Sequence, residues 1–151
     1  MKLITTNKKV FHDYEVKDKY EAGIVLTGDE VKSIRAGNVS LADSFATFHD
    51  NELFLINCHI PPYSHSYLKN EKNSRKSRKL LLHKKEISRL IGDVSKKGVT
   101  IVPLKMYFNA KGYIKVEIAT AKHKNVASKK RELKERDIKR ETEREIKGKL
   151  R

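Results

Sequence analysis

The sequence predicts a mainly β protein with some helix: a small antiparallel barrel, helices on its outside, and a basic C-terminal tail. Three observations support this fold class. Short apolar runs rich in branched and aromatic side chains alternate with turn residues from about Tyr14 to Ala121. Two segments show apolar residues at helical spacing. Residues 122–151 hold only five large apolar side chains, too few for a core of their own.

The first elements are a strand and a short helix. "EAGIVL", residues 21–26, is rich in branched side chains and predicts a strand. "TGDEVKSIRAG" follows it. Thr27 is a good N-cap, and Glu30 stands three residues later, which is the spacing of a capping box. Val31 and Ile34 give the helix an apolar face, and Gly37 ends it in a conformation that glycine adopts cheaply.

Two hairpins are expected in the remainder of the core. "SFATF" and "ELFLI" are joined by His49, Asp50 and Asn51, residues that tolerate turn geometry. "TIVPLKMYF" and "YIKVEIA" flank "NAKG", which ends in Gly112. The second strand of this pair alternates between an apolar face and a polar face, so one face is buried. Pro103 cannot donate to a sheet ladder and predicts an edge or a bulge.

A basic segment and a longer helix lie between the hairpins. "YLKNEKNSRKSRKLLLHKK" holds one acid, Glu71, among many cations and is expected to be a mobile loop suited to a phosphate backbone. A helix is predicted from about Lys84 to Lys97, with Gly98 as its stop. Together these short strands and two helices suggest the oligonucleotide-binding type of barrel, although periodicity alone does not fix the topology.

Size and charge narrow the function. A chain of 151 residues favours one domain, residues 1–121, with an appended tail, residues 122–151. The formal net charge of +15 and the pI of about 9.9 indicate a polyanionic partner, and nucleic acid is the default.

The sequence also bears on localisation. No long apolar run or basic amphipathic leader supports binding to a membrane. The first residues, "MKLITTNKK", lack the apolar stretch of a signal peptide, so we expect the protein to be cytoplasmic. Cys58 is the single cysteine and is expected to be a small buried or half-buried residue.

No enzyme signature is present in the sequence. There is no phosphate-binding loop, dinucleotide fingerprint or nucleophile elbow. The six histidines lack metal-ligand spacing, and Asp29–Glu30 is explained by the helix N-terminus. We therefore expect no catalysis, no metal and no cofactor.

The tail carries charges of alternating sign. Glu132 and Arg136, and Glu143 and Lys147, are examples of favourable i,i+4 pairs, each contributing ~0.2–0.5 kcal/mol to a helix. The tail lacks a continuous apolar stripe. It can thus be a solvated appendage or a segment that orders only on a partner, and the residues alone leave both open.

Several segments in order resemble the SmpB family, the SsrA-binding proteins. They are "HDYEVKDKYEAGIVLTGDEVKSIRAGNVSLADSFA", "LFLINCHIPPYSH", "RKLLLHKKEISRLIG", "KGVTIVPLKMYF" and "KVEIATAK". The resemblance runs from about Asn7 to Lys122. It implies a non-enzymatic protein, monomeric when free, whose barrel binds the tRNA-like domain of transfer-messenger RNA and delivers it to stalled bacterial ribosomes for tagging. It also implies a tail that is disordered when free and helical in the decoding centre and message channel.

The resemblance places candidate residues at two sites. The RNA-binding candidates are Asn7, Lys8, His12, Glu30, Lys32, Ser33, Arg35, His59 and Tyr63, with Arg75, Lys76 and Arg78 from the basic segment. The candidates for the decoding centre are Lys124, Lys129, Lys130, Arg131, Lys134 and Arg136. Glu30 has two open roles, as a helix cap or as a direct RNA contact. Tyr63 can equally stack on a base or close the barrel end.

The tail departs from the family's usual glycine-lysine-lysine run and later aspartate-lysine-arginine. His123 stands for the glycine, Asn125 for a lysine, Ser128 for the aspartate and Lys130 for the arginine. These departures concern the decoding-centre step and leave the core typical. Two other hypotheses remain: a structural ribosomal protein or assembly factor with the same barrel, and a metal-dependent nuclease.

Overall fold

The structure, a computed structural model, describes residues 1–63 and 74–124. The tail positions from residue 125 onward, including Lys129, Lys130, Arg131, Lys134 and Arg136, lie outside the described residues. The described elements are β1 (Lys2–Thr6), α1 (Lys8–Asp13), β2 (Tyr14–Ile24), α2 (Gly28–Arg35), β3 (Phe45–His49), β4 (Glu52–Ile56), β5 (Arg78–Leu81), α3 (Lys84–Val94), β6 (Val99–Phe108) and β7 (Ile114–His123).

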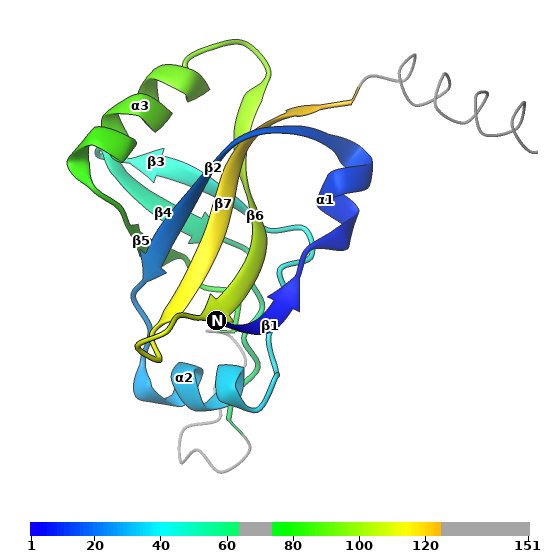
Figure 1. Ribbon diagram of the computed structural model, residues 1–151, viewed down its shortest axis with the longest axis vertical. Coiled ribbons are helices and arrows are strands. Elements are labelled where there is room, and N and C mark those ends of the chain that lie inside the picture. Colours follow the sequence, from blue (N-terminus) through cyan, green and yellow to red (C-terminus); the bar gives the residue numbers. More distant parts are fainter. Residues whose placement is uncertain (64–73, 125–151) are drawn as a thin grey trace, which may run out of the picture.

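The strands form one antiparallel sheet that closes on itself (Figure 1). Its order is β1-β6-β3-β4-β5-β2-β7, and β7 also pairs with β6. Strand β6 can have this many neighbours because its first half meets β3 at Ile101, while its second half meets β1 from Lys105 to Phe108. Closure removes most open sheet edges. The predicted antiparallel barrel is therefore confirmed.

The barrel interior is filled by alternate side chains of the strands. Leu53 and Leu55 from β4 meet Val116 and Ile118 from β7, all at most 1% exposed. Ile34 from α2 joins the same core and is also 1% exposed. Burying each such side chain contributes ~1.5–3 kcal/mol, so the apolar face of β7 that the alternation predicted is a main source of stability.

The turn chemistry follows the sequence closely. Asp50 and Asn51 both have positive φ, 51° and 63°, in the β3–β4 turn, as a two-residue hairpin turn requires. Gly112 has φ of 83° in the β6–β7 turn. The pairing register shifts between Pro103 and Lys105, so Pro103 lies at a bulge, one of the two places that were expected.

Two predicted boundaries were wrong, those of β2 and α3, and three elements, β1, α1 and β5, were not predicted. Strand β2 begins at Tyr14, seven residues before "EAGIVL", because its exposed first half pairs with β7. Strand β1 and helix α1 were not predicted, since Val10 is the single buried residue of α1 and gives no periodicity. The basic segment contains β5, and α3 ends at Val94 rather than near Lys97.

The helices lie outside the barrel at different places (Figure 1). Helix α1 covers a second apolar cluster in which Val10 packs with Val102, Leu104, Ala119 and Ala121. Helix α2 follows the end of β2, at the bottom of the view, whereas α1 precedes the start of β2. Strand β2 has 11 residues. At about 3.3 Å per residue it separates the α1 and α2 ends by roughly 30 Å.

Candidate nucleic-acid interface

The short helix α2 is fixed by the capping box that the sequence predicted. The Glu30 N–H donates to Thr27 Oγ1 at 3.2 Å, and the Thr27 N–H donates to Glu30 Oε1 at 2.9 Å. Gly37 closes the helix with φ of 84°. This reciprocal pair satisfies two backbone donors that the first turn leaves without helical partners. The capping role of Glu30 is confirmed.

Glu30 also joins α2 to the basic segment. Its Oε2 accepts from Arg78 Nε, and Lys76 Nζ lies 3.6 Å from its Oε1. The Glu30 side chain is 11% exposed and that of Arg78 is 1% exposed. Burial by itself would raise the pKa of the Glu30 carboxyl, but the Thr27 N–H and the Arg78 guanidinium outweigh it and hold that pKa below 4.5. Glu30 is therefore ionised and engaged within the protein.

Arg78 is buried, which corrects its expected place on an RNA-facing loop. Its Nη1 donates to the carbonyls of Cys58 at 2.7 Å and Lys76 at 3.2 Å, and its Nη2 donates to that of Ser74 at 3.0 Å. A guanidinium presents several donors in a rigid fork, and here they hold the start of β5 against α2. Arg78 therefore shapes the surface from beneath.

Other α2-side candidates divide between buried and outward positions. Ser33 is 0% exposed and donates to Pro61 O at 2.7 Å, so its hydroxyl anchors the segment before Tyr63 and does not face RNA. Lys32 and Arg35 are exposed on the same helix. Lys32 Nζ lies 5.7 Å from the centroid of the Tyr63 ring, within cation–π range. Tyr63 is thus positioned beside α2, where its two predicted roles stay open.

His59, Arg75 and Lys76 complete the α2 side. His59 pairs with Ser40 through its backbone in an isolated bridge, and its Nδ1 is buried without a hydrogen-bond partner. Arg75 is exposed, and its Nη1 donates to Asn57 Oδ1 at 3.3 Å. Nine of the RNA-binding candidates therefore lie on or near α2. They are Glu30, Lys32, Ser33, Arg35, His59, Tyr63, Arg75, Lys76 and Arg78.

The remaining candidates, Asn7, Lys8 and His12, lie at the start of α1 and on it. Lys8 and His12 are exposed on α1, at the other end of β2. Asn7 is 5% exposed, and its side-chain amide donates to Leu41 O at 3.2 Å and Pro103 O at 3.1 Å. The expectation that Asn7 faces RNA is corrected, because both donors of its amide are engaged inside the protein. Leu41, which accepts from Asn7, directly follows Ser40, the bridge partner of His59, so Asn7 links the start of α1 to the α2 side.

Helix α1 adjoins the C-terminal end of β7, residues His123 and Lys124, which we call the root of the tail. Strand β7 continues to His123, which pairs with Tyr14, and the Lys124 N–H donates to Asp13 O at 2.9 Å. The rings of Tyr14 and His123 meet edge to face with centroids 4.8 Å apart. His12 Nδ1 lies 3.0 Å from Asp13 Oδ1. The α1 cations thus share a surface with the root of the tail.

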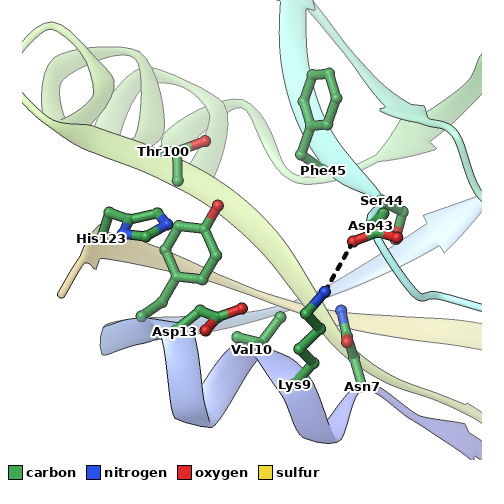
Figure 2. Close-up of a pocket in the computed structure, with 10 residues that line it drawn as sticks. Asn7, Lys9, Val10, Asp13, Asp43, Ser44, Phe45, Thr100 and His123 are labelled. Atoms are coloured by element: carbon green, nitrogen blue, oxygen red, sulfur yellow. Dashed lines mark ion pairs between the residues drawn. The ribbon is translucent and has the colours of Figure 1, made fainter. Parts of the chain in front are cut away.

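A pocket of about 320 Å³ opens beside this root (Figure 2). Val10 and Asp13 line one side of it, and Phe45 and Thr100 line the other. Lys9 reaches across the rim toward Asp43, with 3.6 Å between Nζ and Oδ1. The exposed pair contributes at most ~1 kcal/mol, so it can open without much cost.

One surface near α2 was missed in the candidate residues. On the outside of the sheet, Tyr107, Lys115, Gly23 and Leu81 form one row across four strands. A Cβ added at Gly23 would lie 3.4 Å from Leu81 Cβ and 3.7 Å from Lys115 Nζ, so these two side chains flank the glycine. Leu81 is itself 50% exposed. Glycine inside a strand often marks a bulge or a place where another chain approaches closely. Gly23 within "EAGIVL" was therefore the sequence feature that could have pointed to this surface.

The neighbouring row contains the polar side chains Lys105, Glu117 and Glu21. Tyr107 donates its hydroxyl to Glu21 Oε2, and Lys105 Nζ is 3.9 Å from Glu117 Oε2. Burial and the Glu21 carboxylate both raise the pKa of Tyr107 above 10.0, so it stays a hydrogen-bond donor at neutral pH. These two contacts hold the polar row in place beside the row that contains Gly23.

Cys58 is completely buried, as expected, and burial raises its pKa to about 11. A thiol with that pKa is a poor nucleophile at neutral pH. Among residues 1–63 and 74–124, no group of three or more His, Cys, Asp or Glu is placed to hold a metal ion. No helix in these ranges is long and apolar enough to cross a membrane.

Comparison with known proteins gives consistent matches. The family model for the SmpB protein matches residues 4–148. The SsrA-binding protein of a Sulfurihydrogenibium species is 54% identical over 149 residues, covering 99% of this chain and 97% of that protein. The SsrA-binding protein of Coprothermobacter proteolyticus is 48% identical over 151 residues, covering 100% of this chain and 99% of that protein.

A solved structure described as "tmRNA-SmpB: a journey to the center of the bacterial ribosome" is also similar. It is 51% identical, with a TM-score of 0.67, and the match covers 81% of this chain and 85% of the other. The sequence and the fold therefore point to the same set of relatives.

Proposed function

This chain belongs to the SmpB protein family, and from that premise we propose that it binds the tRNA-like domain of transfer-messenger RNA and delivers it to stalled ribosomes. The process rescues the ribosome and tags the incomplete chain. The single observation that carries this function is identity of about 50% over nearly the whole length to SsrA-binding proteins. The related structure that includes transfer-messenger RNA and the ribosome supports the same two partners.

We propose that RNA binds at the α2 end of the barrel. Lys32, Arg35, Arg75 and Lys76 offer exposed cations there. The adjacent row adds Lys115, which pairs with Gly23 across the β2–β7 ladder, as a further cation for an RNA backbone. Lysine and arginine supply the salt-dependent part of the affinity, whereas the rigid sheet supplies recognition by shape. Glu30, Arg78 and Ser33 act as supports that fix this surface.

We assign the α1 end to the ribosome. Lys8 and His12 lie beside the root of the tail, so a partner that takes up the tail meets them as well. The proposed tail boundary moves from Ala121 to after Lys124, since β7 runs to His123 and the Lys124 N–H is paired. Lys124 is then the one decoding-centre candidate in the described residues, and the others remain predictions.

The remaining properties follow from this role. An adaptor of this kind performs no covalent step, binds as a monomer to its RNA and works in the cytoplasm, where ribosomes are. The family is an RNA-binding one, as its SsrA-binding members are described. No observation favours the structural ribosomal protein over this function.

The test compares RNA binding with tagging in a reconstituted translation system. A chain ending after Lys124 should bind the tRNA-like RNA within about two-fold of the full chain at fixed salt, and should fail to support tagging. The paired variants Lys8→Ala and His12→Ala should follow the same pattern, whereas Lys115→Glu should weaken RNA binding itself. Constant co-sedimentation with a ribosomal subunit in cells lacking transfer-messenger RNA would instead indicate a structural ribosomal protein.

A further inference from the structure

We propose that the outer face of the β3–β4 hairpin, centred on Phe54, is a stacking site for an unpaired base of the bound RNA. The proposal rests on the proposed function for the identity of that RNA. The site does not include the row through Gly23, and it shares only Phe45 with the pocket beside the tail root. The proposal is based on an apolar hollow on the outer face of the sheet, where solvent-facing side chains are normally polar.

The register defines which side chains point outward. Leu53 and Leu55 are buried in the barrel, so Phe54 and Ile56 between and after them face outward. Across the ladders, Phe54 stands opposite Thr47 on β3 and Lys79 on β5. A hollow of about 340 Å³ lies over this face, lined by Thr47, Phe48, His49, Phe54, Ile56 and Ser77.

This composition is unusual for the outside of a closed antiparallel sheet. The outward residues of such a sheet are normally polar, because one face meets water. Here Phe54 and Ile56 are partly exposed in the same strand. Phe45, directly opposite Ile56, is 41% exposed and extends the apolar strip. A contiguous apolar strip on the surface indicates a binding partner.

The surroundings of the hollow favour a nucleobase as the occupant. Ser77 on its rim directly follows Lys76, whose Nζ is 3.6 Å from Glu30 of α2. The rim of the hollow is therefore one residue along the chain from a cation of the α2 end, where we place the RNA. Lys79, opposite Phe54 on β5, is another cation beside the hollow, and its Nζ lies 3.2 Å from Glu52 Oε1. Aromatic platforms next to cations are how proteins bind unpaired bases.

The polar groups of the rim suit a base better than another protein. Thr47 and Ser77 each offer a hydroxyl that both donates and accepts, and so tolerates either edge of a base. A second copy of this chain is disfavoured as the occupant, because each copy carries a formal net charge of +15 and the copies repel. We therefore assign the hollow to an unpaired base.

The sequence contains no tryptophan, so Phe54→Trp introduces a single fluorophore at the site. Titration with a ten-nucleotide oligoadenylate should quench its emission, because the base stacks on the indole ring. Leu3→Trp is the matched control, since Leu3 is 53% exposed on β1, which pairs with the other half of β6. Quenching at residue 54 with an unchanged signal at residue 3 supports the site. The proposal is overturned if the two tryptophan variants are quenched equally, or if neither is quenched.

Affinity separates stacking from simple packing. Phe54→Leu keeps an apolar side chain but removes the ring, and should weaken oligoadenylate binding about five-fold or more, as expected for loss of one stacked base. Phe54→Tyr should stay within about two-fold. Thermal melting establishes that both variants fold. Equal affinities for the two variants, or a concentration-dependent dimer that Phe54→Leu abolishes, would refute base stacking. Binding of the tRNA-like RNA by the unchanged protein tests the proposed function separately.

Discussion

Replacing Glu30 by Gln is the sharpest test of how α2 is held. Glu30 accepts from the Thr27 N–H and from Arg78 Nε through different carboxylate oxygens. Glutamine retains one carbonyl oxygen, so it can still accept from Thr27. It removes the negative charge that faces a guanidinium whose side chain is 1% exposed.

The expected loss of stability follows from that geometry. Removing one partner of a buried ion pair costs ~3–5 kcal/mol when the remaining charge is left uncompensated. Arg78 keeps the carbonyls of Cys58, Lys76 and Ser74 as acceptors, so the full penalty does not apply. One hydrogen bond to a charged group contributes about 1.5–3 kcal/mol. We therefore expect Glu30→Gln to lower the free energy of unfolding by about 2 kcal/mol.

Urea denaturation at pH 7 measures this difference, with Glu52→Gln as the control. Glu52 pairs with Lys79 at 3.2 Å, but its side chain is 51% exposed, so its loss should cost no more than about 0.5–1 kcal/mol. RNA affinity is measured under conditions where each variant is folded. We expect Glu30→Gln to bind the tRNA-like RNA as well as the unchanged protein does. Equal stability of the two variants would refute the buried pair, and a large affinity loss in folded Glu30→Gln would show a direct contact.

The pH dependence of stability gives an independent check. The pKa of Glu30 lies below 4.5 in the folded state, so the unfolded chain binds more protons in the range between the two pKa values. The contribution of Glu30 is complete above about 4.5 and declines as pH falls through the folded pKa. The stability of Glu30→Gln should therefore fall less steeply in this acidic range.

Three further predictions concern residues away from this pair. Asn7→Ala removes two buried donors and should cost about 2–4 kcal/mol in urea denaturation, with RNA affinity of the folded variant unchanged. Cys58, with a pKa of about 11, should react with a disulfide reagent at pH 8 at least about 100-fold more slowly in the folded protein than in denaturant. His123→Gly removes the ring contact with Tyr14 and should speed hydrogen exchange of the Lys124 amide about ten-fold, while Tyr14→Phe should leave it unchanged.

Local chemistry explains why much of the fold was predictable from the sequence. The capping box of α2, the β3–β4 turn and the Gly112 turn each depend on residues within a few positions of one another. The alternation along β7 predicted its buried face for the same reason. In each case the determining contacts are near in sequence, so a pattern can report them.

Arg78 shows why part of the candidate site was not predictable. Its neighbours in sequence are basic and polar, which is typical of an exposed loop. Its burial depends on Glu30, 48 positions away, and on the carbonyl of Cys58, 20 positions away, besides the nearby carbonyls of Ser74 and Lys76. Asn7 is similar, because its acceptors on Leu41 and Pro103 are distant in the chain. No local pattern encodes such contacts.

Placing an acid in so cationic a protein is consistent with an RNA-binding surface. Glu30 neutralises a charge that would otherwise be buried, on Arg78, and does so from beneath α2. The cations Lys32 and Arg35 on the same helix stay exposed. A buried pair adds little to the external field, whereas exposed lysine and arginine attract phosphate. It follows that neutralising Lys32 and Arg35 should reduce the salt dependence of RNA binding, whereas Glu30→Gln should leave that salt dependence unchanged.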